Sequence, residues 1–163
     1  MPNLYNYTFN ESANTYTFST KNNIEYKIVF IVDETLDFAS DIPIPNVFQI
    51  IIEKVTDDIE PFDSLVSKTI ENIVTIFFIN VENSLIYICS QDEERAEKRF
   101  NVFDRWYKKS TLKSVKKADN IVRFESGGNT YIIYSSLLYH DENPNIEFIL
   151  SAYENIERVV NGK

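Results

Sequence analysis

The chain has 163 residues, of which 44% are hydrophobic and 25% are charged. These values are close to those of an average globular domain, which excludes disordered and collagen-like chains, and the length suits one domain over residues 1–163. A disulfide-stapled scaffold is also excluded, because Cys89 is the only cysteine.

The charge is negative overall and unevenly distributed. The formal net charge is −9, yet the segment Arg95–Arg123 holds ten basic and three acidic residues, which gives +7 there and leaves −16 for the rest. The negative total argues against nucleic-acid binding. A charge dipole of this kind can orient a protein partner, although a solvated basic helix on an acidic protein would have the same sequence.

The first ten residues, MPNLYNYTFN, lack the basic and apolar regions of a signal peptide. No apolar run reaches the ~18–20 residues that a membrane span needs, since the longest run, around Ile70–Ile79, is interrupted by polar residues. The sequence therefore predicts a cytoplasmic protein. Frequent Ile, Asn, Lys and Tyr indicate AT-rich codons and a bacterial source.

Period-two alternation predicts strands in the N-terminal third. Tyr5–Phe9 and Tyr16–Phe18 alternate aromatic with polar residues on either side of an asparagine-rich turn, which is typical of a hairpin. Ile24–Val32 continues the pattern and ends apolar throughout. Two prolines in Asp41–Pro45 predict a loop, and a further strand is expected over Val47–Val55.

Helical spacing follows. Apolar residues recur at helical intervals from Asp63 or Ser64 to Asn80, and a short buried strand is expected over Ser84–Cys89. Ser90–Glu93 matches the S-x-x-E capping box, which predicts the start of a second helix. The apolar stripe of that helix comprises Ala96, Phe100, Phe103 and Tyr107, extended by Val102 and Trp106.

In the C-terminal third, the basic segment Lys113–Asp119 predicts a linker. Asn120–Glu125 and Thr130–Leu138 predict a hairpin closed at Ser126–Asn129, and a last helix follows Asp141–Asn145. The order β-β-β-β-α-β-α-β-β-α predicts an α+β fold, with a mainly antiparallel mixed sheet of about seven strands and three helices.

One constellation on the second helix is a candidate ligand- or partner-binding site. Asp92, Arg95 and Arg99 fall on one helix face at i, i+3 and i+7, and Trp106 continues that line. A pair of guanidinium groups beside an aromatic ring can bind a carboxylate or a phosphate. Two structural alternatives remain open, namely solvated ion pairs within the helix and an Arg99 that covers the sheet edge.

Other chemistry is not indicated. His140 has no second histidine to pair with, so no metal site is expected, and it is predicted to lie in a solvated loop. Cys89 has no histidine base nearby in the sequence and is predicted to be buried and structural. Phosphate-binding glycine motifs and catalytic serine motifs are missing, so we expect no catalytic residue and no cofactor.

Several motifs resemble a small bacterial family, one of the domains of unknown function. They are Y-x-F-x-T at Tyr16–Thr20, T-I-x-x-I at Thr69–Ile73, I-Y-I-C at Ile86–Cys89, and D-x-x-R-x-x-x-R-x-x-x-F-x-x-W at Asp92–Trp106. The resemblance covers most of the chain and implies no activity.

The order β-α-β-α-β-β from Val47 to Leu138 is similar to the core of GNAT-type N-acetyltransferases. The resemblance implies a Q/R-x-x-G-x-G/A loop that binds the coenzyme A pyrophosphate before the first helix, but residues 56–64 hold four acidic residues and no glycine. It also implies an asparagine and a tyrosine on the next helix. Asp92 is the loose counterpart of the asparagine here, and Phe103 or Tyr107 is that of the tyrosine. A GNAT-like fold here would be a degenerate, non-acetylating version.

These features predict a non-enzymatic protein- or ligand-binding domain that acts with another protein or as a homodimer. The alternative is a GNAT-like acyl-CoA-dependent transferase with a degenerate cofactor loop. A third interpretation is a regulator that binds its ligand through Arg95 and Arg99.

Overall fold

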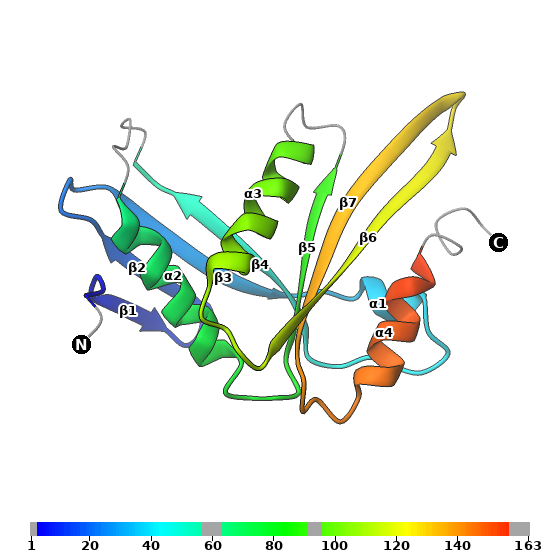
Figure 1. The fold of residues 1–163 in the computed structure, drawn as a ribbon, viewed down its shortest axis with the longest axis horizontal. Coiled ribbons are helices and arrows are strands. Elements are labelled where there is room, and N and C mark those ends of the chain that lie inside the picture. Colours follow the sequence, from blue (N-terminus) through cyan, green and yellow to red (C-terminus); the bar gives the residue numbers. More distant parts are fainter. Residues whose placement is uncertain (1–2, 57–62, 91–95, 157–163) are drawn as a thin grey trace.

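The computed structural model of the protein describes residues 3–56, 63–90 and 96–156 (Figure 1). The strands in these residues are β1 (Tyr7–Asn10), β2 (Thr15–Ser19), β3 (Glu25–Val32), β4 (Val47–Lys54), β5 (Ser84–Ser90), β6 (Val115–Ser126) and β7 (Asn129–His140). The helices are α1 (Thr35–Phe38), α2 (Ser64–Phe77), α3 (Ala96–Lys109) and α4 (Ile146–Glu154).

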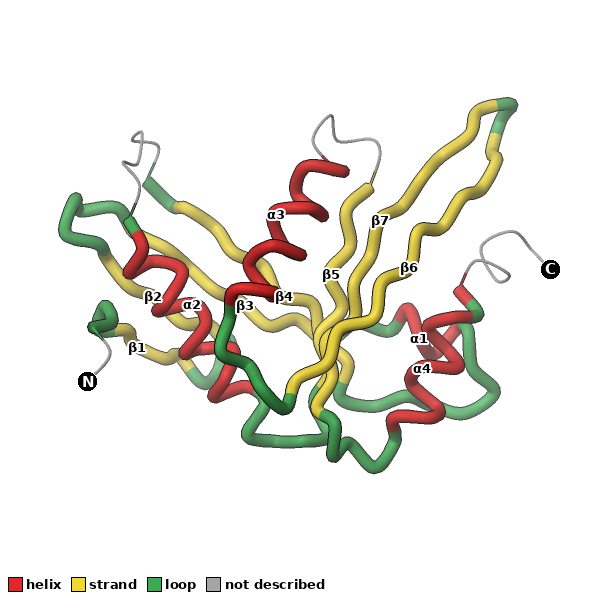
Figure 2. The backbone as a smooth tube through the Cα atoms, in the orientation of Figure 1, coloured by secondary structure: helices red, strands yellow, loops and turns green. Residues whose placement is uncertain are grey.

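The seven strands form one sheet in the order β1-β2-β3-β4-β5-β7-β6 (Figure 2). All neighbours are antiparallel except β4 and β5, which run parallel because α2 provides the crossover between them. The predicted α+β fold with a mostly antiparallel sheet is therefore confirmed. The four-residue helix α1 is not predicted by the sequence.

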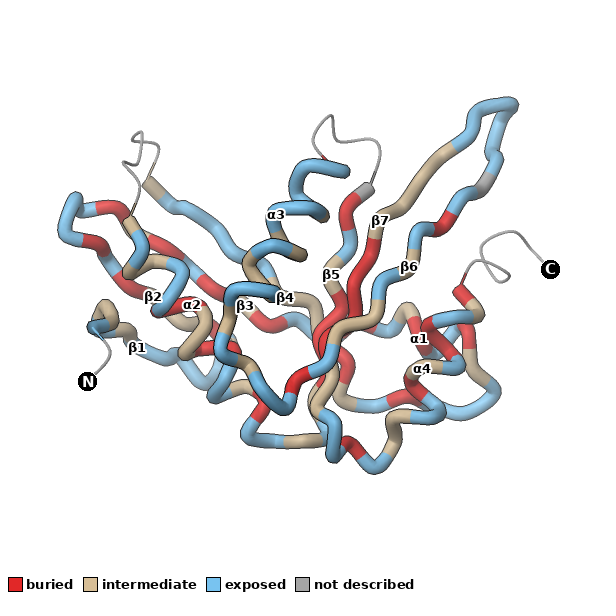
Figure 3. Tube along the Cα trace, viewed as in Figure 1, coloured by how far each residue is buried: buried red, intermediate tan, exposed pale blue. Residues whose placement is uncertain are grey.

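Helices cover both faces of the sheet. Leu85 and Leu138 pack in one hydrophobic core with α2 and α3, whereas their neighbours Ile86 and Leu137 pack in a second core with α1 and α4. Successive residues of a strand point to opposite faces, so the two cores lie on opposite sides of the sheet. Figure 3 shows the buried backbone concentrated where the strands meet these helices.

The start of α2 follows its sequence signal. Asp63 precedes the helix, and its Oδ1 atom accepts a hydrogen bond from the Leu65 amide at 3.0 Å. The helix then buries Ile70, Ile73 and Val74 against the sheet. This helix is thereby confirmed, although it ends at Phe77 rather than Asn80.

Two predictions for the C-terminal third are wrong. β6 begins at Val115, so most of the expected basic linker Lys113–Asp119 is strand, and the side chain of Lys117 is only 5% exposed because Asp104 and Asp119 neutralise its charge. His140 is the last residue of β7 rather than a loop residue, and its side chain is 15% exposed. Cys89 is buried, as expected.

Candidate functional site

The sheet divides at its one parallel pair. β4 and β5 are paired only between Val47–Gln49 and Ser84–Ile86, and beyond these residues the two strands diverge (Figure 1). β4 remains paired with β3 as far as Lys54, and β5 with β7 as far as Ser90. Two half-sheets result, and they part at the carboxyl ends of two parallel strands, where open α/β sheets bind ligands.

A cavity of about 710 Å³ lies over this division, and we call it the α2–α3 cavity. Its floor consists of Ile50 and Ile52 of β4, Leu85 and Tyr87 of β5, and Leu138 of β7. Ile50, Ile52 and Tyr87 follow the last paired residues of their strands, so they line the floor because the strands have separated. The volume falls in the range of ~300–1,000 Å³ that small-molecule sites occupy.

Two helices form the walls of the cavity. α2 contributes Val66, Ser67, Ile70 and Val74, and α3 contributes Lys98, Arg99, Val102, Phe103 and Trp106. Arg99, Val102, Phe103 and Trp106 follow one another at the i, i+3, i+4, i+7 spacing, so a single face of α3 lines the cavity.

α2 is fixed to the half-sheet that contains β3 and β4. The Phe77 ring stacks on Phe30 of β3 with centroids 4.5 Å apart and meets Phe48 of β4 edge-on at 5.3 Å. Nearer the start of the helix, Asn72 Oδ1 accepts a hydrogen bond from the hydroxyl of Tyr7 on β1 at 2.7 Å. These contacts join this wall to the strands of the first half-sheet.

α3 is fixed to the other half-sheet. The Phe103 ring stacks on Tyr87 of β5 with centroids 4.4 Å apart and planes inclined by 10°. The Tyr107 hydroxyl donates to the Val115 carbonyl of β6 at 2.6 Å. The two walls thus make their ring contacts with different half-sheets, and both also pack in the hydrophobic core that contains Leu85 and Leu138.

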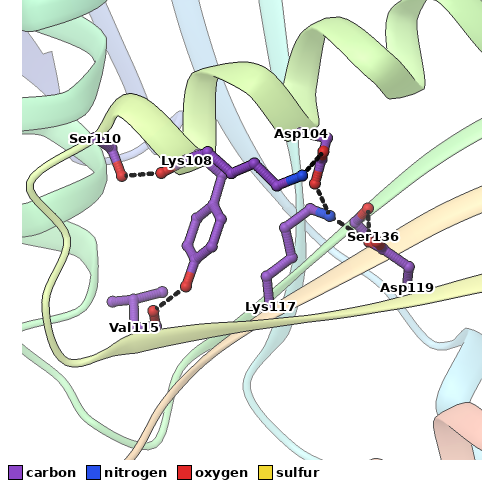
Figure 4. A network of polar contacts seen from close by, with 8 residues as sticks. Asp104, Lys108, Ser110, Val115, Lys117, Asp119 and Ser136 are labelled. Atoms are coloured by element: carbon purple, nitrogen blue, oxygen red, sulfur yellow. Dashed lines mark hydrogen bonds and ion pairs between the residues drawn. The ribbon is translucent and has the colours of Figure 1, made fainter.

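A polar network supports α3 from the side of β6 (Figure 4). Lys117 Nζ lies 2.8 Å from Asp104 Oδ1 on α3 and 2.5 Å from Asp119 Oδ1, which also accepts from the Ser136 hydroxyl at 2.7 Å. Burial favours the neutral amine of Lys117, but the hydrogen bonds to Asp104 and Asp119 outweigh it and raise the Lys117 pKa. Hydrogen bonds from Lys108 and Lys117 lower the pKa of Asp104.

Charged groups lie at the edges of the α2–α3 cavity. Asp63 stands at the N-terminus of α2, and the exposed residues Lys98 and Arg99 lie in the first turn of α3. The Asp63 carboxylate already accepts hydrogen bonds from the Tyr5 hydroxyl and the Leu65 amide. The hydrogen bond from Tyr5 is the main reason why the pKa of Asp63 is lowered.

The predicted site residues fall into two groups. Arg99 and Trp106 both line the α2–α3 cavity, and they share it with the floor residues of the divided sheet. Asp92 and Arg95 lie outside the described residues, as does the predicted capping box apart from Ser90.

The sequence does not identify the floor of the cavity. The sequence places Ile50, Ile52 and Tyr87 in ordinary strands, because an apolar run indicates burial and not separation from a neighbouring strand. A usable signal is the polar end of the β4 segment: Glu53 and Lys54 follow the isoleucines, although a central strand is normally apolar throughout.

The described lining offers binding groups and an apolar surface. Ser67 Oγ donates to the Ser64 carbonyl at 3.1 Å, so its hydroxyl is engaged within α2. Residues 3–56, 63–90 and 96–156 contain no cluster of three or more metal-ligating side chains. In the same residues, no helix is long and apolar enough to cross a membrane. The arrangement can therefore bind a ligand that has an apolar part and an acidic end. The apolar part would contact the isoleucines of the floor, and the acidic end would pair with Lys98 and Arg99.

Comparison with known protein families shows what part of the chain is similar to. Residues 62–155 match a protein family described as "Family of unknown function (DUF6169)". The matched segment contains both walls of the α2–α3 cavity and the floor strands β5 and β7. No curated protein and no solved structure matches the chain.

Proposed function

The chain belongs to this family of unknown function, and because the matched residues include both walls of the α2–α3 cavity, we propose that this cavity is its functional site. The proposed role is that of a non-enzymatic ligand-binding domain. Its ligand is an elongated small molecule with an apolar chain and a carboxylate or phosphate at one end. The observation that carries this proposal is an apolar cavity with two cationic side chains at its edge.

The apolar part of the ligand would lie over the divided sheet. Ile50, Ile52 and Val102 line the cavity, and Ile52 and Val102 remain 46% and 54% exposed. Covering this surface would stabilise a complex by about 25 cal/mol for each Å² of apolar area removed from water. Exposed apolar residues that converge on one cavity are the usual mark of a binding site.

The charged end of the ligand is an acid in this proposal. Lys98 and Arg99 give the α3 wall two positive charges, whereas Asp63, the one acidic residue among the described lining residues, is occupied by its own helix and by Tyr5. A carboxylate or phosphate near α3 would therefore be attracted, and an ammonium group would be repelled.

A second candidate is the GNAT-like acyl-CoA-dependent transferase. One observation favours it, namely that β4 and β5 run parallel, separate, and are each followed by a helix. Against it, the Asp63 carboxylate occupies the start of α2, where the coenzyme pyrophosphate would need free amides. The remaining residues of that loop, 57–62, lie outside the described residues.

Titration calorimetry with decanoate and decylamine tests the ligand-binding proposal. Decanoate should bind and decylamine should not, because only the carboxylate pairs with the α3 wall. Val102→Trp, which fills the cavity, should weaken decanoate binding by about tenfold or more. Ile79→Trp is the matched control, since Ile79 is 76% exposed and lies outside the cavity.

Equal binding of the two amphiphiles, or decanoate binding that Val102→Trp leaves unchanged, would refute the proposal. Acetyl-CoA separates the second candidate from the first. A rise in the melting temperature with millimolar acetyl-CoA that Val102→Trp abolishes would favour the transferase, and an unchanged melting temperature would exclude it.

A further inference from the structure

The outer edge of the sheet is formed by β6, a strand of twelve residues. Among the described residues, its distal part is paired with β7 alone, because the described part of β5 ends at Ser90, opposite Ile133. Arg123–Ser126 and Asn129–Ile132 thus form a two-stranded ribbon that projects beyond the rest of the sheet, and most of it is exposed (Figure 3). Such a ribbon is marginally stable alone, and a long open edge invites a further strand.

The hydrogen-bonding pattern shows which residues of β6 face that edge. Gly127 and Gly128 both have positive φ, 59° and 81°, as a two-residue type I′ turn requires, so Ser126 and Asn129 form the hydrogen-bonded closing pair. Bonded and non-bonded pairs alternate in an antiparallel ladder. Even-numbered residues of β6 therefore bond to β7, and odd-numbered residues direct their N–H and C=O groups outward.

Two contacts at the other end of β6 agree with this pattern. The Asp141 amide donates to the carbonyl of Ser114, an even-numbered residue, at 2.8 Å and so extends the ladder with β7. The carbonyl of Val115, an odd-numbered residue, instead accepts from the Tyr107 hydroxyl at 2.6 Å. The open edge accordingly runs from Lys117 to Glu125, since no other strand in the described part of the chain pairs with it.

We propose that this edge is a homodimer interface in which β6 of two copies pair antiparallel about Ile121. The proposal rests on the sheet edge and is independent of the α2–α3 cavity. The N–H and C=O groups of each Ile121 point outward, so the two copies of this residue form a hydrogen-bonded pair on the two-fold axis. The result is one continuous sheet of fourteen strands, because the two seven-stranded sheets join edge to edge.

Charge complementarity selects this register. With Ile121 opposite its copy, Asp119 lies opposite Arg123 of the second copy, and Lys117 lies opposite Glu125. Each pair occurs twice because the interface is symmetric. Opposite charges placed directly across two strands stabilise their pairing, and like charges destabilise it.

The neighbouring registers place like charges opposite each other. A shift of the axis to Asn120 puts Lys117 opposite Arg123, and a shift to Asp119 puts that carboxylate opposite its own copy. A shift in the other direction, to Val122, puts Asp119 opposite Glu125. The axis at Ile121 avoids all three repulsions.

The exposed side chains suit this arrangement. Ile121 is 41% exposed, so a β-branched apolar side chain lies open at the proposed axis. Asp119 is 44% exposed, and its contacts with Lys117 and Ser136 both use Oδ1, which leaves Oδ2 for a guanidinium. Lys117 is buried between its own two carboxylates, so the decisive contact is that between Asp119 and Arg123.

Sedimentation velocity tests the interface through a charge reversal. The protein should form a dimer as its concentration rises to about 1 mM, and Arg123→Asp should weaken that association by about tenfold or more, because it creates two repulsive pairs with Asp119. Lys116→Asp is the matched control. It makes the same change of charge on the same strand. Because Lys116 lies opposite the uncharged Ser126 of the second copy, this variant should dimerise as strongly as the parent protein.

A disulfide tests the register directly. In a Cys89→Ala background, Ile121→Cys should form a covalent dimer on mild oxidation, since the Cα atoms of a hydrogen-bonded pair lie about 5.5 Å apart, within disulfide range. Arg123→Cys should not, because in this register its copy lies four residues away along the partner strand.

The outcomes of these experiments do not depend on whether the α2–α3 cavity binds a ligand. A protein that stays monomeric at every concentration and an Ile121→Cys variant that does not cross-link would overturn the proposal. Equal weakening by Arg123→Asp and Lys116→Asp, or cross-linking at position 123 in place of 121, would overturn it as well. The circular dichroism spectrum of each variant shows whether it is folded, and the cross-linking result does not depend on the charge variants.

Discussion

Lys117 Nζ lies 2.8 Å from Asp104 Oδ1, so a lysine of the edge strand β6 is held by a carboxylate of helix α3. The same nitrogen lies 5.6 Å from the centre of the Phe100 ring, which places the charge over an aromatic face. Because α3 forms one wall of the α2–α3 cavity, this contact ties the wall to its half-sheet. Its contribution to stability can be measured.

Asp104→Asn should lower the free energy of unfolding by about 1–2 kcal/mol near neutral pH, because Lys117 keeps only one charged partner. The pKa of Asp104 is lowered from 3.8 by its hydrogen bonds to Lys108 and Lys117. Its charged form therefore stabilises the fold above pH 3.8, and this contribution is lost as the pH falls through the lowered pKa. Urea unfolding of both proteins as a function of pH should show the difference shrinking in acid.

Lys108→Met is the control for this prediction. Lys108 also lies 2.8 Å from Asp104, but its side chain is 71% exposed, so its loss should change stability by less than about 0.5 kcal/mol. A larger effect from Lys108→Met than from Asp104→Asn would contradict the assignment of Lys117 as the main partner.

Lys117 also shows where the sequence pattern misleads. Three lysines within Lys113–Asp119 are typical of a solvated linker, yet Lys116 is exposed and the side chain of Lys117 is buried, on the two faces of one strand. The carboxylate of Asp104 comes from another element, thirteen residues earlier. No local pattern shows this pairing, and so the sequence places the start of β6 too late.

Elements with a strong period were predicted well. The helix that begins at Ser64 and the hairpin closed by Gly127 and Gly128 are both present, since each follows from local preferences. The α2–α3 cavity could not be predicted, because it depends on β4 and β5 separating after Gln49 and Ile86. Separation is a property of two strands and the helices packed on them, and in the sequence only the polar residues Glu53 and Lys54 at the end of β4 point to it.

A buried hydroxyl pair on the opposite face gives a second prediction. Tyr153 Oη and Ser135 Oγ lie 2.8 Å apart, and Ser135 donates its proton to the Asn120 carbonyl at 3.0 Å, so the tyrosine is the donor between the two. Tyr153→Phe should lower the free energy of unfolding by about 1 kcal/mol, as measured by urea unfolding at neutral pH.

The alkaline behaviour of this variant provides an independent check. Burial raises the pKa of Tyr153 well above its ordinary value of 10.0, so the neutral form is favoured in the folded state. Stability from this group is complete below pH 10.0 and falls as the pH rises above it, because the unfolded chain then ionises first. The Phe variant should lose less stability above pH 10.0 than the parent, and an equal loss would rule out this role for Tyr153.

The third prediction concerns the N-terminus of α2. The Tyr5 hydroxyl donates to Asp63 Oδ2 and is the main cause of the lowered pKa of that carboxyl. Tyr5→Phe should therefore raise the Asp63 pKa toward its ordinary value of 3.8. An NMR titration of the aspartate side chains measures this shift, and Tyr7→Phe serves as the control because Tyr7 bonds to Asn72 instead. An Asp63 pKa that is the same in all three proteins would contradict the contact.

The last prediction concerns the α3 wall and its stacking on the floor. Phe103 and Tyr87 stack with centroids 4.4 Å apart, and this contact joins the wall to β5. Phe103→Ala should lower the free energy of unfolding by about 2–3 kcal/mol, somewhat less than a fully buried phenylalanine, because the ring is half-buried.

Val102→Ala is the matched change on the same helix. Val102 also lines the cavity, but it is 54% exposed, so truncation should alter stability by less than about 0.5 kcal/mol. Urea unfolding of the two variants separates anchoring from lining, because of these two residues only Phe103 stacks on a ring of the sheet. If the two truncations lowered stability equally, Phe103 would be a lining residue like Val102, and α3 would owe its position to the Lys117 network and to Tyr107.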